Sequence, residues 1–218
     1  MLSREIYLIV NGSGSRLGEF LVELHFDQPG ILATLSNIFA EHDVNIINIA
    51  IDSQRRHLHF VVDLTTVVED DIREIAKRLG MFAFVKKVRY RVSNVSVFVP
   101  RWIVHVINGM PSISLERELV AYLQEPSRLA EELAKKDAKT IKELVTPIDI
   151  ATLEEILYLS QLRGLAIVEN TMLKEGRLVA RLCKLAYPMA KRYLEYYLRE
   201  LGFQPKTVEE GGCIRAEV

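Results

Sequence analysis

Phe20–Asp52, FLVELHFDQPGILATLSNIFAEHDVNIINIAID, is the stretch that decides the fold of this chain. Apolar residues recur at every second position over residues 20–26, which predicts a half-buried β-strand. Over residues 31–39 they recur three and four positions apart, which predicts an amphipathic helix with one buried stripe. A second strand is expected to begin at Asn45. The segment therefore predicts a strand, a tight turn, a helix and a strand.

The turn before the helix is Asp27-Gln28-Pro29-Gly30. We expect the carboxylate of Asp27 to cap the helix, and Pro29 fits the first turn because no hydrogen-bond donor is missed there. Gly30 has no side chain, so the backbone can approach a neighbouring chain or a ligand closely. Because the N–H groups at a helix start attract a carboxylate, the turn predicts a site for a small carboxylate-bearing ligand.

A family resemblance rests on this turn and on the start of the second strand. The residues that carry it are Asp27, Pro29, Gly30, Ile31, Leu32 and the pair Asn45-Ile46. With them, the segment from Gly18 to about Val92 resembles the ACT domain, a small regulatory module that binds amino acids in many metabolic enzymes and regulators. The resemblance implies that the turn meets a partner module and that an amino acid is held between the two.

The resemblance also implies a set of ligand-binding residues. They are Asp27, Gln28, Pro29, Gly30, Ile31, Leu32, Asn45 and Asn48. Gly30, Ile31 and Leu32 would contribute backbone contacts, and the two asparagines could read polar groups of the ligand. In a plainer alternative, Asp27 only caps the helix, Gly30 only allows close packing, and no ligand binds, since a module does not guarantee retained binding.

The rest of the N-terminal half completes a ferredoxin-like plan. Apolar residues alternate over residues 58–64 and 88–92, which predicts two more strands. Between them, residues 69–71 place acidic charge at a helix start, and Gly80 ends that helix. The order βαββαβ is the split βαβ arrangement, with both helices on one sheet face. Its open face and edge strands predict a homodimer through the N-terminal sheets.

The sequence lacks the residues that other functions of the ferredoxin-like fold require. An RNA-recognition module needs stacking aromatic rings on its central strands, and a metal chaperone needs paired cysteines near the first turn. Neither pattern occurs here. His25, His57 and His59 are expected on the open face, where three imidazoles could bind a metal. The plainer alternative is a half-polar face that packs on another surface.

The second half predicts an α+β domain, with residues 1–94 as the ACT-type domain and 95–218 as the second. Helices are expected over residues 115–123 and 129–144, and a third helix with a capping box of Thr152 and Glu155. Two strands at 165–169 and 178–182, a helix from Pro188 to Leu201 and a hairpin over 207–218 should follow. A further strand is expected over residues 6–10 and a turn at Asn108-Gly109.

A second resemblance covers about residues 115–218, on the helix with Leu115-Glu116-Arg117-Glu118-Leu119, the turn Arg163-Gly164-Leu165 and the cysteine-bearing ending. This region resembles the 4-vinyl-reductase-type domain, a small-molecule-sensing module of some transcriptional regulators. The resemblance implies that Cys183, Glu210 and Cys213 could hold a zinc ion with a fourth ligand missing. The alternative is that Cys183 is a small buried hydrophobe and Cys213 a strand residue.

Composition excludes several classes. The 218 residues carry a net charge of −1, which gives no electrostatic reason to expect nucleic acid. Apolar runs are too short to span a bilayer, and no signal-peptide core is seen. The two cysteines give no disulfide framework, so we expect a cytoplasmic protein with reduced thiols.

No catalytic motif occurs, and the paired acids Glu131-Glu132, Glu154-Glu155 and Glu209-Glu210 are expected to be solvated surface. The sequence therefore predicts a non-catalytic regulatory protein that binds a small molecule, with an amino acid as the expected ligand. The alternative is a zinc-binding protein or a metal-dependent enzyme that uses Cys183, Glu210 and Cys213.

Overall fold

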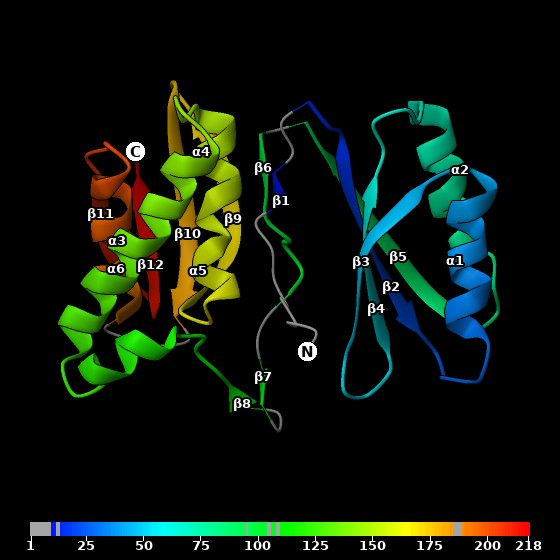
Figure 1. Ribbon diagram of the computed structural model, residues 1–218, viewed down its shortest axis with the longest axis horizontal. Coiled ribbons are helices and arrows are strands. Elements are labelled where there is room, and N and C mark those ends of the chain that lie inside the picture. The colour runs from blue at the N-terminus through cyan, green and yellow to red at the C-terminus, as the bar shows by residue number, and fades with distance from the viewer. Residues whose placement is uncertain (1–9, 12–13, 95, 104–105, 108–109, 185–188) are drawn as a thin grey trace. The chain divides into compact units, whose positions relative to one another are not determined.

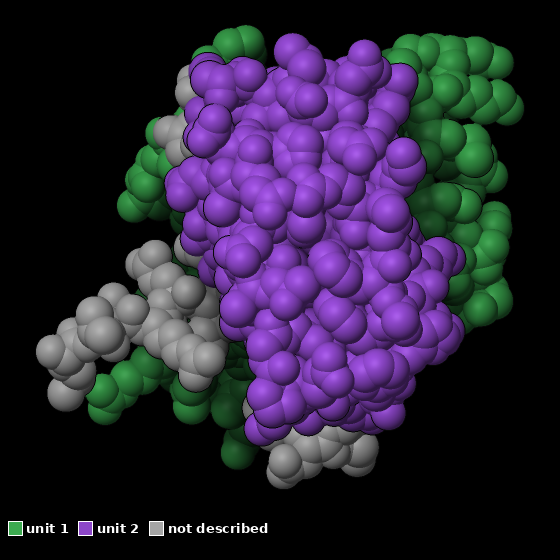
Figure 2. Space-filling model, turned by 90° about the vertical axis from the view of Figure 1, so that its right-hand side faces the viewer, with its two compact units in different colours: residues 1–11, 99–218 green, residues 12–98 purple. Residues whose placement is uncertain are grey.

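The computed structural model describes residues 10–11, 14–94, 96–103, 106–107, 110–184 and 189–218. The chain divides into two compact units: residues 12–98, purple in Figure 2, and residues 1–11 with 99–218, green in Figure 2. The domain assignment to residues 1–94 and 95–218 stays a prediction. The predicted strand over residues 6–10 lies mostly outside the described residues, as do the predicted turn at Asn108-Gly109 and helix start at Pro188.

The unit of residues 12–98 has the predicted ferredoxin-like fold. Its elements are β2 (Leu17–Leu24), α1 (Ile31–Glu41), β3 (Asn45–Ile51), β4 (His57–Asp63), α2 (Glu69–Gly80), β5 (Val85–Ser93) and β6 (Val97–Phe98). β3, β4, β2 and β5 form one antiparallel sheet in that order. Helices α1 and α2 both cover one of its faces (Figure 1). The edge strands are therefore β3 and β5.

The core of this unit lies between the sheet and its two helices. Phe39 on α1 contacts Phe20 on β2 and Phe60 on β4, with ring centroids 5.2 and 5.1 Å apart. Ile72 and Leu79 from α2 are fully buried in the same cluster. Because one face of the sheet and one stripe of each helix supply all these side chains, the alternating and helical patterns of the sequence account for the core.

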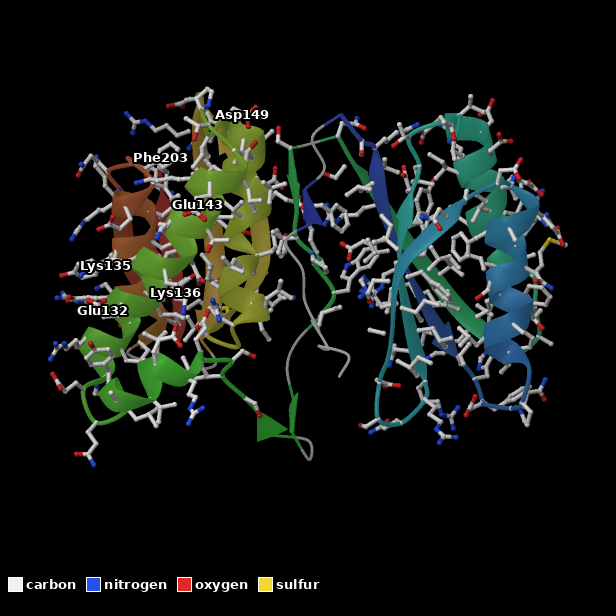
Figure 3. The ribbon with its side chains drawn as sticks, viewed as in Figure 1. Glu132, Lys135, Lys136, Glu143, Asp149 and Phe203 are labelled. Carbon is white, nitrogen blue, oxygen red and sulfur yellow. A yellow bond between two sulfur atoms is a disulfide. The ribbon has the colours of Figure 1, made fainter. Side chains whose placement is uncertain are left out.

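The other unit is α+β, as predicted. Its elements are β1 (Val10–Asn11), β7 (Val106–Ile107), β8 (Met110–Pro111), the 3₁₀ helix η1 (Arg117–Tyr122), α3 (Pro126–Leu144), α4 (Ile150–Leu157), α5 (Leu159–Leu162), β9 (Ala166–Lys174), β10 (Arg177–Lys184), α6 (Met189–Glu200), β11 (Lys206–Glu210) and β12 (Cys213–Glu217). The sheet order is β11-β12-β10-β9, and its pairs are antiparallel. α3 and α6 pack against each other. The long polar face of α3 carries ion pairs such as Lys135 to Glu132, at 2.9 Å (Figure 3).

The start of the third predicted helix differs from the expected capping box. Asp149, not Thr152, is the N-cap of α4, and its carboxylate accepts a hydrogen bond from the N–H of Thr152 at 2.7 Å. Thr152 and Glu155 are buried instead. The prediction that Glu155 is solvated surface is therefore wrong, because its carboxylate accepts hydrogen bonds from another segment of the unit.

A buried charged cluster ties the first part of this unit to α3 and α6. Arg163 donates to both oxygens of Asp137 on α3, and to Glu116 at 2.7 Å. The hydroxyl of Tyr193 on α6 donates to Asp137 at 2.8 Å. Burial raises the pKa of Asp137 above its usual value, and the hydrogen bond from Arg163 offsets only part of that rise. The residue after Arg163 is Gly164. A Cβ at this position would lie only 1.9 Å from the carbonyl oxygen of Ser112, so the close approach requires glycine.

Candidate ligand-binding site

A cavity of about 770 Å³ opens where α1 begins, at the predicted turn. One wall consists of residues 27–32, which are six of the eight predicted ligand-binding residues. The opposite wall consists of the end of β3 and the turn into β4. The lining residues from that second wall are Ile51, Asp52, Ser53, Arg55 and Leu58.

Gly30 shapes the first wall. Its φ is +91°, a left-handed conformation that favours glycine, and a Cβ built there would meet no atom within 4 Å. The carbonyl oxygen of Gly30 accepts hydrogen bonds from the N–H and hydroxyl of Thr34, at 2.9 and 3.0 Å. No side chain caps α1, so the predicted cap by Asp27 is wrong. The N-cap position falls on Gly30, which has no side chain, and the Asp27 carboxylate lies 3.7 Å from a guanidinium nitrogen of Arg55 instead.

Asp52 holds the second wall. One oxygen accepts hydrogen bonds from the N–H groups of Arg56 and His57, at 2.7 and 3.1 Å, and the other lies 2.9 Å from Nδ1 of His57. Partial burial would raise the pKa of Asp52, but the hydrogen bonds from His57 and the backbone hold it below its usual value. Arg55 has a φ of +55° within this turn. The turn is therefore fixed by one ionised carboxylate.

The cavity combines opposite charges with an apolar surface. Asp27 supplies a carboxylate, Arg55 supplies a guanidinium, and the start of α1 presents backbone N–H groups. Leu32 and Ile51 expose large apolar side chains beside them. Such a surface can contact an ammonium, a carboxylate and an aliphatic group at the same time.

Two predicted ligand-binding residues lie outside this cavity. Asn45 pairs with Asp63, and Asn48 pairs with Val61 beside an irregularity in the β3–β4 register. The second wall was missed because the sequence marks residues 52–56 only as a turn. The one local signal was Asp52 at the end of a strand, since an aspartate there often fixes a turn through its side chain.

The three predicted open-face histidines have different surroundings. His59 is buried, and its Nε2 lies 2.6 Å from Glu19. His57 binds Asp52, and His25 is exposed. Over the part of the chain that the structure describes, no group of possible metal ligands includes a histidine. The sheet thus gives each imidazole its own environment.

Glu19 is the centre of a buried charged cluster on this sheet. Its second oxygen accepts a hydrogen bond from Nε of Arg91 on β5. Burial would raise the pKa of Glu19, but the hydrogen bond with His59 and the charge of Arg91 hold it below its usual value. The cluster therefore keeps a fully buried carboxylate ionised.

Cys183 and Cys213 form a disulfide, so the prediction of reduced thiols is wrong. They are 30 residues apart in the sequence but face each other directly in the register of β10 and β12. The carboxylate within 4.8 Å of the two sulfurs belongs to Glu169, not to the predicted Glu210. A metal binds thiolates rather than a disulfide. The cytoplasmic location stays a prediction. Disulfides are unusual in cytoplasmic proteins.

A family model for the ACT domain matches residues 19–80. Residues 19–80 form an ACT domain. The match covers both cavity walls. The resemblance of residues 115–218 to the 4-vinyl-reductase-type domain receives no support. No curated protein matches the chain. Among the described residues, no helix has both the length and the apolar character needed to cross a bilayer.

Solved structures that are similar to the chain include the following three. The ACT domain of a GTP pyrophosphokinase from Chlorobium tepidum is 15% identical, with 35% of this chain and 97% of that chain covered and a TM-score of 0.29. The C-terminal domain of MgtC from Mycobacterium tuberculosis is 11% identical, with coverages of 40% and 97% and a TM-score of 0.32. The regulatory subunit of aspartate kinase from Thermus flavus is 14% identical, with coverages of 85% and 92% and a TM-score of 0.30. Values this low indicate nothing about ligand or activity.

Proposed function

We propose that this protein is a non-catalytic regulator that binds an amino acid in the cavity of its ACT domain. The observation that supports this proposal is the juxtaposition of Asp27, Arg55 and the uncapped start of α1 around one opening. Together they offer partners for both charges of a zwitterion. The carboxylate would meet the N–H groups of α1 and Arg55, and the ammonium would meet Asp27.

The apolar part of the lining favours an aliphatic side chain. Leu32 and Ile51 are 39% and 49% exposed, and the buried Leu58 lines the cavity with them. Burying such surface on binding is favourable in proportion to its area. An acidic side chain would instead meet Asp27 and Asp52. We therefore expect leucine, isoleucine or valine to bind more tightly than aspartate.

A second copy of the chain would complete the site. The cavity is an open groove of the size that takes drug-sized ligands, so one amino acid would leave much of it uncovered. Beside it, β3 is an edge strand with three exposed isoleucines, Ile47, Ile49 and Ile51. Exposed apolar edges tend to pair with another chain. We propose a homodimer in which β3 of each copy lies at the interface.

Isothermal titration calorimetry of the full chain with L-leucine and L-aspartate tests the proposed site. We expect saturable binding of leucine and much weaker binding of aspartate. Gly30→Val should abolish leucine binding, because its side chain would occupy the space in front of the α1 N–H groups. Leucine affinity that is unchanged in Gly30→Val would remove the site assignment.

The matched control is Gly176→Val, in the turn between β9 and β10. Gly176 has a φ of +77° and, like Gly30, leaves space for a Cβ, so both variants impose the same kind of backbone strain. Gly176→Val should bind leucine like the wild type. Loss of binding in both variants would indicate a folding effect.

The dimer is tested separately by light scattering of the chromatographed protein. We expect a two-chain mass for the wild type and a one-chain mass for Ile49→Lys, since a charge on β3 opposes pairing of the edge. A two-chain mass in both proteins would place the interface elsewhere.

A further inference from the structure

A short connector, defined here as residues 97–103, joins the two units, and each of its two ends contacts its own unit. Within the unit of residues 12–98, the guanidinium of Arg91 lies 4.6 Å from the ring centroid of Phe98, which is buried. Val99 belongs to the other unit, and its N–H donates to the buried Glu155 at 2.9 Å. Phe98, which is anchored in one unit by Arg91, and Val99, which is anchored in the other by Glu155, are thus joined by a single peptide bond.

The anchor at Phe98 continues into the buried cluster of the ACT domain. Arg91 donates to Glu19, and Glu19 lies 2.6 Å from His59. Glu19 and His59 are both buried. Separating either side chain from its partners would leave a buried polar group without a partner, which costs free energy. Strands β2, β4 and β5 are therefore expected to shift together with Phe98.

The same cluster lies one residue from the cavity. His59 follows Leu58 on β4, and Leu58 lines the cavity together with its cross-strand partner Ile51. Neighbouring residues of a strand point to opposite faces, so Leu58 faces the cavity while His59 faces Glu19. A ligand that presses on Leu58 and Ile51 thus acts on the strand that carries His59.

The anchor at Val99 continues into α4 and α5. Glu155 on α4 also accepts from Arg101, at 3.1 Å. The side-chain amide of Gln161 on α5 donates to the carbonyl oxygens of Arg101 and Ile103, at 2.6 and 3.1 Å. A shift of the connector is therefore passed to these helices through buried hydrogen bonds rather than absorbed by a loose loop.

From these contacts we propose that the connector transmits the occupancy of the ACT-domain cavity to α4 and α5 of the other unit. The inference rests on the proposed function, because it needs a ligand in that cavity. The ligand stabilises one conformation of the group formed by Glu19, Arg91 and Phe98 over another. The connector changes conformation with this group, and the change reaches Glu155. The site would then regulate the unit of residues 99–218.

Trp102 offers a direct readout, because it lies within the connector and is the only tryptophan of the chain. The full chain is titrated with L-leucine, and binding is followed by calorimetry and indole emission in parallel. We expect the emission to change and to saturate together with binding. Phe98→Leu and Glu155→Gln should still bind leucine but lose the emission change at saturation.

The matched control is Phe203→Leu, which makes the same change at a half-buried residue after α6, outside the connector and its anchors (Figure 3). It should keep both signals. Leucine binding without an emission change in the wild type, or with the change intact in Phe98→Leu and Glu155→Gln, would overturn the inference and leave the proposed function standing. Absence of calorimetric binding for leucine, isoleucine and valine would overturn both.

Discussion

The two units each bury a carboxylate beside an arginine, yet the pKa values of the two carboxylates are shifted in opposite directions. Glu19 in the ACT domain has His59 and Arg91 as partners, and its pKa is held below the usual value. Asp137 in the other unit shares Arg163 with a second acid, and its pKa is raised. The comparison teaches that neighbouring charges, and not burial alone, decide the direction in which the pKa of a buried acid shifts. The negative charge of Glu116 opposes ionisation of Asp137, whereas Arg91 and His59 both favour ionisation of Glu19.

The largest effect is expected from Glu19→Gln. It removes the ionised partner of the buried His59 and the half-buried Arg91, so we expect a loss of about 3–5 kcal/mol in the free energy of unfolding at neutral pH. Urea unfolding followed by circular dichroism measures it. Glu23→Gln is the matched control, since Glu23 lies on the same strand face but is partly exposed and pairs with Lys86. Equal losses in the two variants would show that the buried cluster adds nothing specific.

Asp137→Asn should cost less. An amide keeps much of the shape, and the raised pKa of Asp137 shows that ionisation of this group is disfavoured by burial. We expect a loss of about 1–3 kcal/mol, the cost of weakened hydrogen bonds to Arg163 and Tyr193. The same urea experiment measures it. A loss larger than that of Glu19→Gln would reverse the comparison.

A third contrast uses the left-handed glycines of the two units. Gly30→Ala and Gly176→Ala should each lower the free energy of unfolding by about 1–2 kcal/mol, because each replaces a glycine with positive φ and adds a Cβ that meets no atom. Thermal unfolding of the two variants measures these losses. A stability gain in Gly30→Ala would mean that its turn adopts a different backbone conformation.

The smallest expected effect is the change in the free energy of unfolding per pH unit. This change should have opposite signs for Glu19 and Asp137. Since the pKa of Glu19 is lowered from 4.5, its contribution is present above pH 4.5 and is lost as the pH falls through the folded-state pKa. Since the pKa of Asp137 is raised from 3.8, its contribution is present below pH 3.8 and is lost as the pH rises through the folded-state pKa.

The stability gap between the wild type and Glu19→Gln should therefore narrow as the pH falls, whereas the gap to Asp137→Asn should narrow as it rises. One proton changes the slope by about 1.4 kcal/mol per pH unit at most. Urea unfolding at a series of pH values between about 3 and 7 gives both slopes. Slopes of the same sign would contradict the opposite directions of the two pKa shifts.

The ACT-domain fold and one cavity wall could be predicted from the sequence because they depend on local patterns. Alternation and helical spacing defined β2, α1 and β3, and Gly30 marked the turn. The second wall could not be predicted, because Arg55 and Leu58 reach the cavity only through strand pairing. Likewise, the disulfide depends on the register of β10 and β12, which places Cys183 opposite Cys213.

Buried charges were the other failure of sequence reasoning. Glu19 alternates with apolar residues as a solvated strand residue would, and Glu155 follows another glutamate on a helix. Only the three-dimensional contacts with Arg91, His59 and Val99 show that both carboxylates are buried and paired. A sequence pattern gives the face of a residue but not what covers that face.

The most direct test of the central claim, that the cavity beside Gly30 binds an amino acid, is a nuclear magnetic resonance titration of the ¹⁵N-labelled chain with L-leucine. We predict saturable shifts that are largest for the backbone N–H signals of Gly30, Ile31 and Leu32 and for those of the facing turn at Ser53 and Arg55. Saturable shifts confined to other parts of the chain, or no shifts with leucine, isoleucine and valine, would contradict the account.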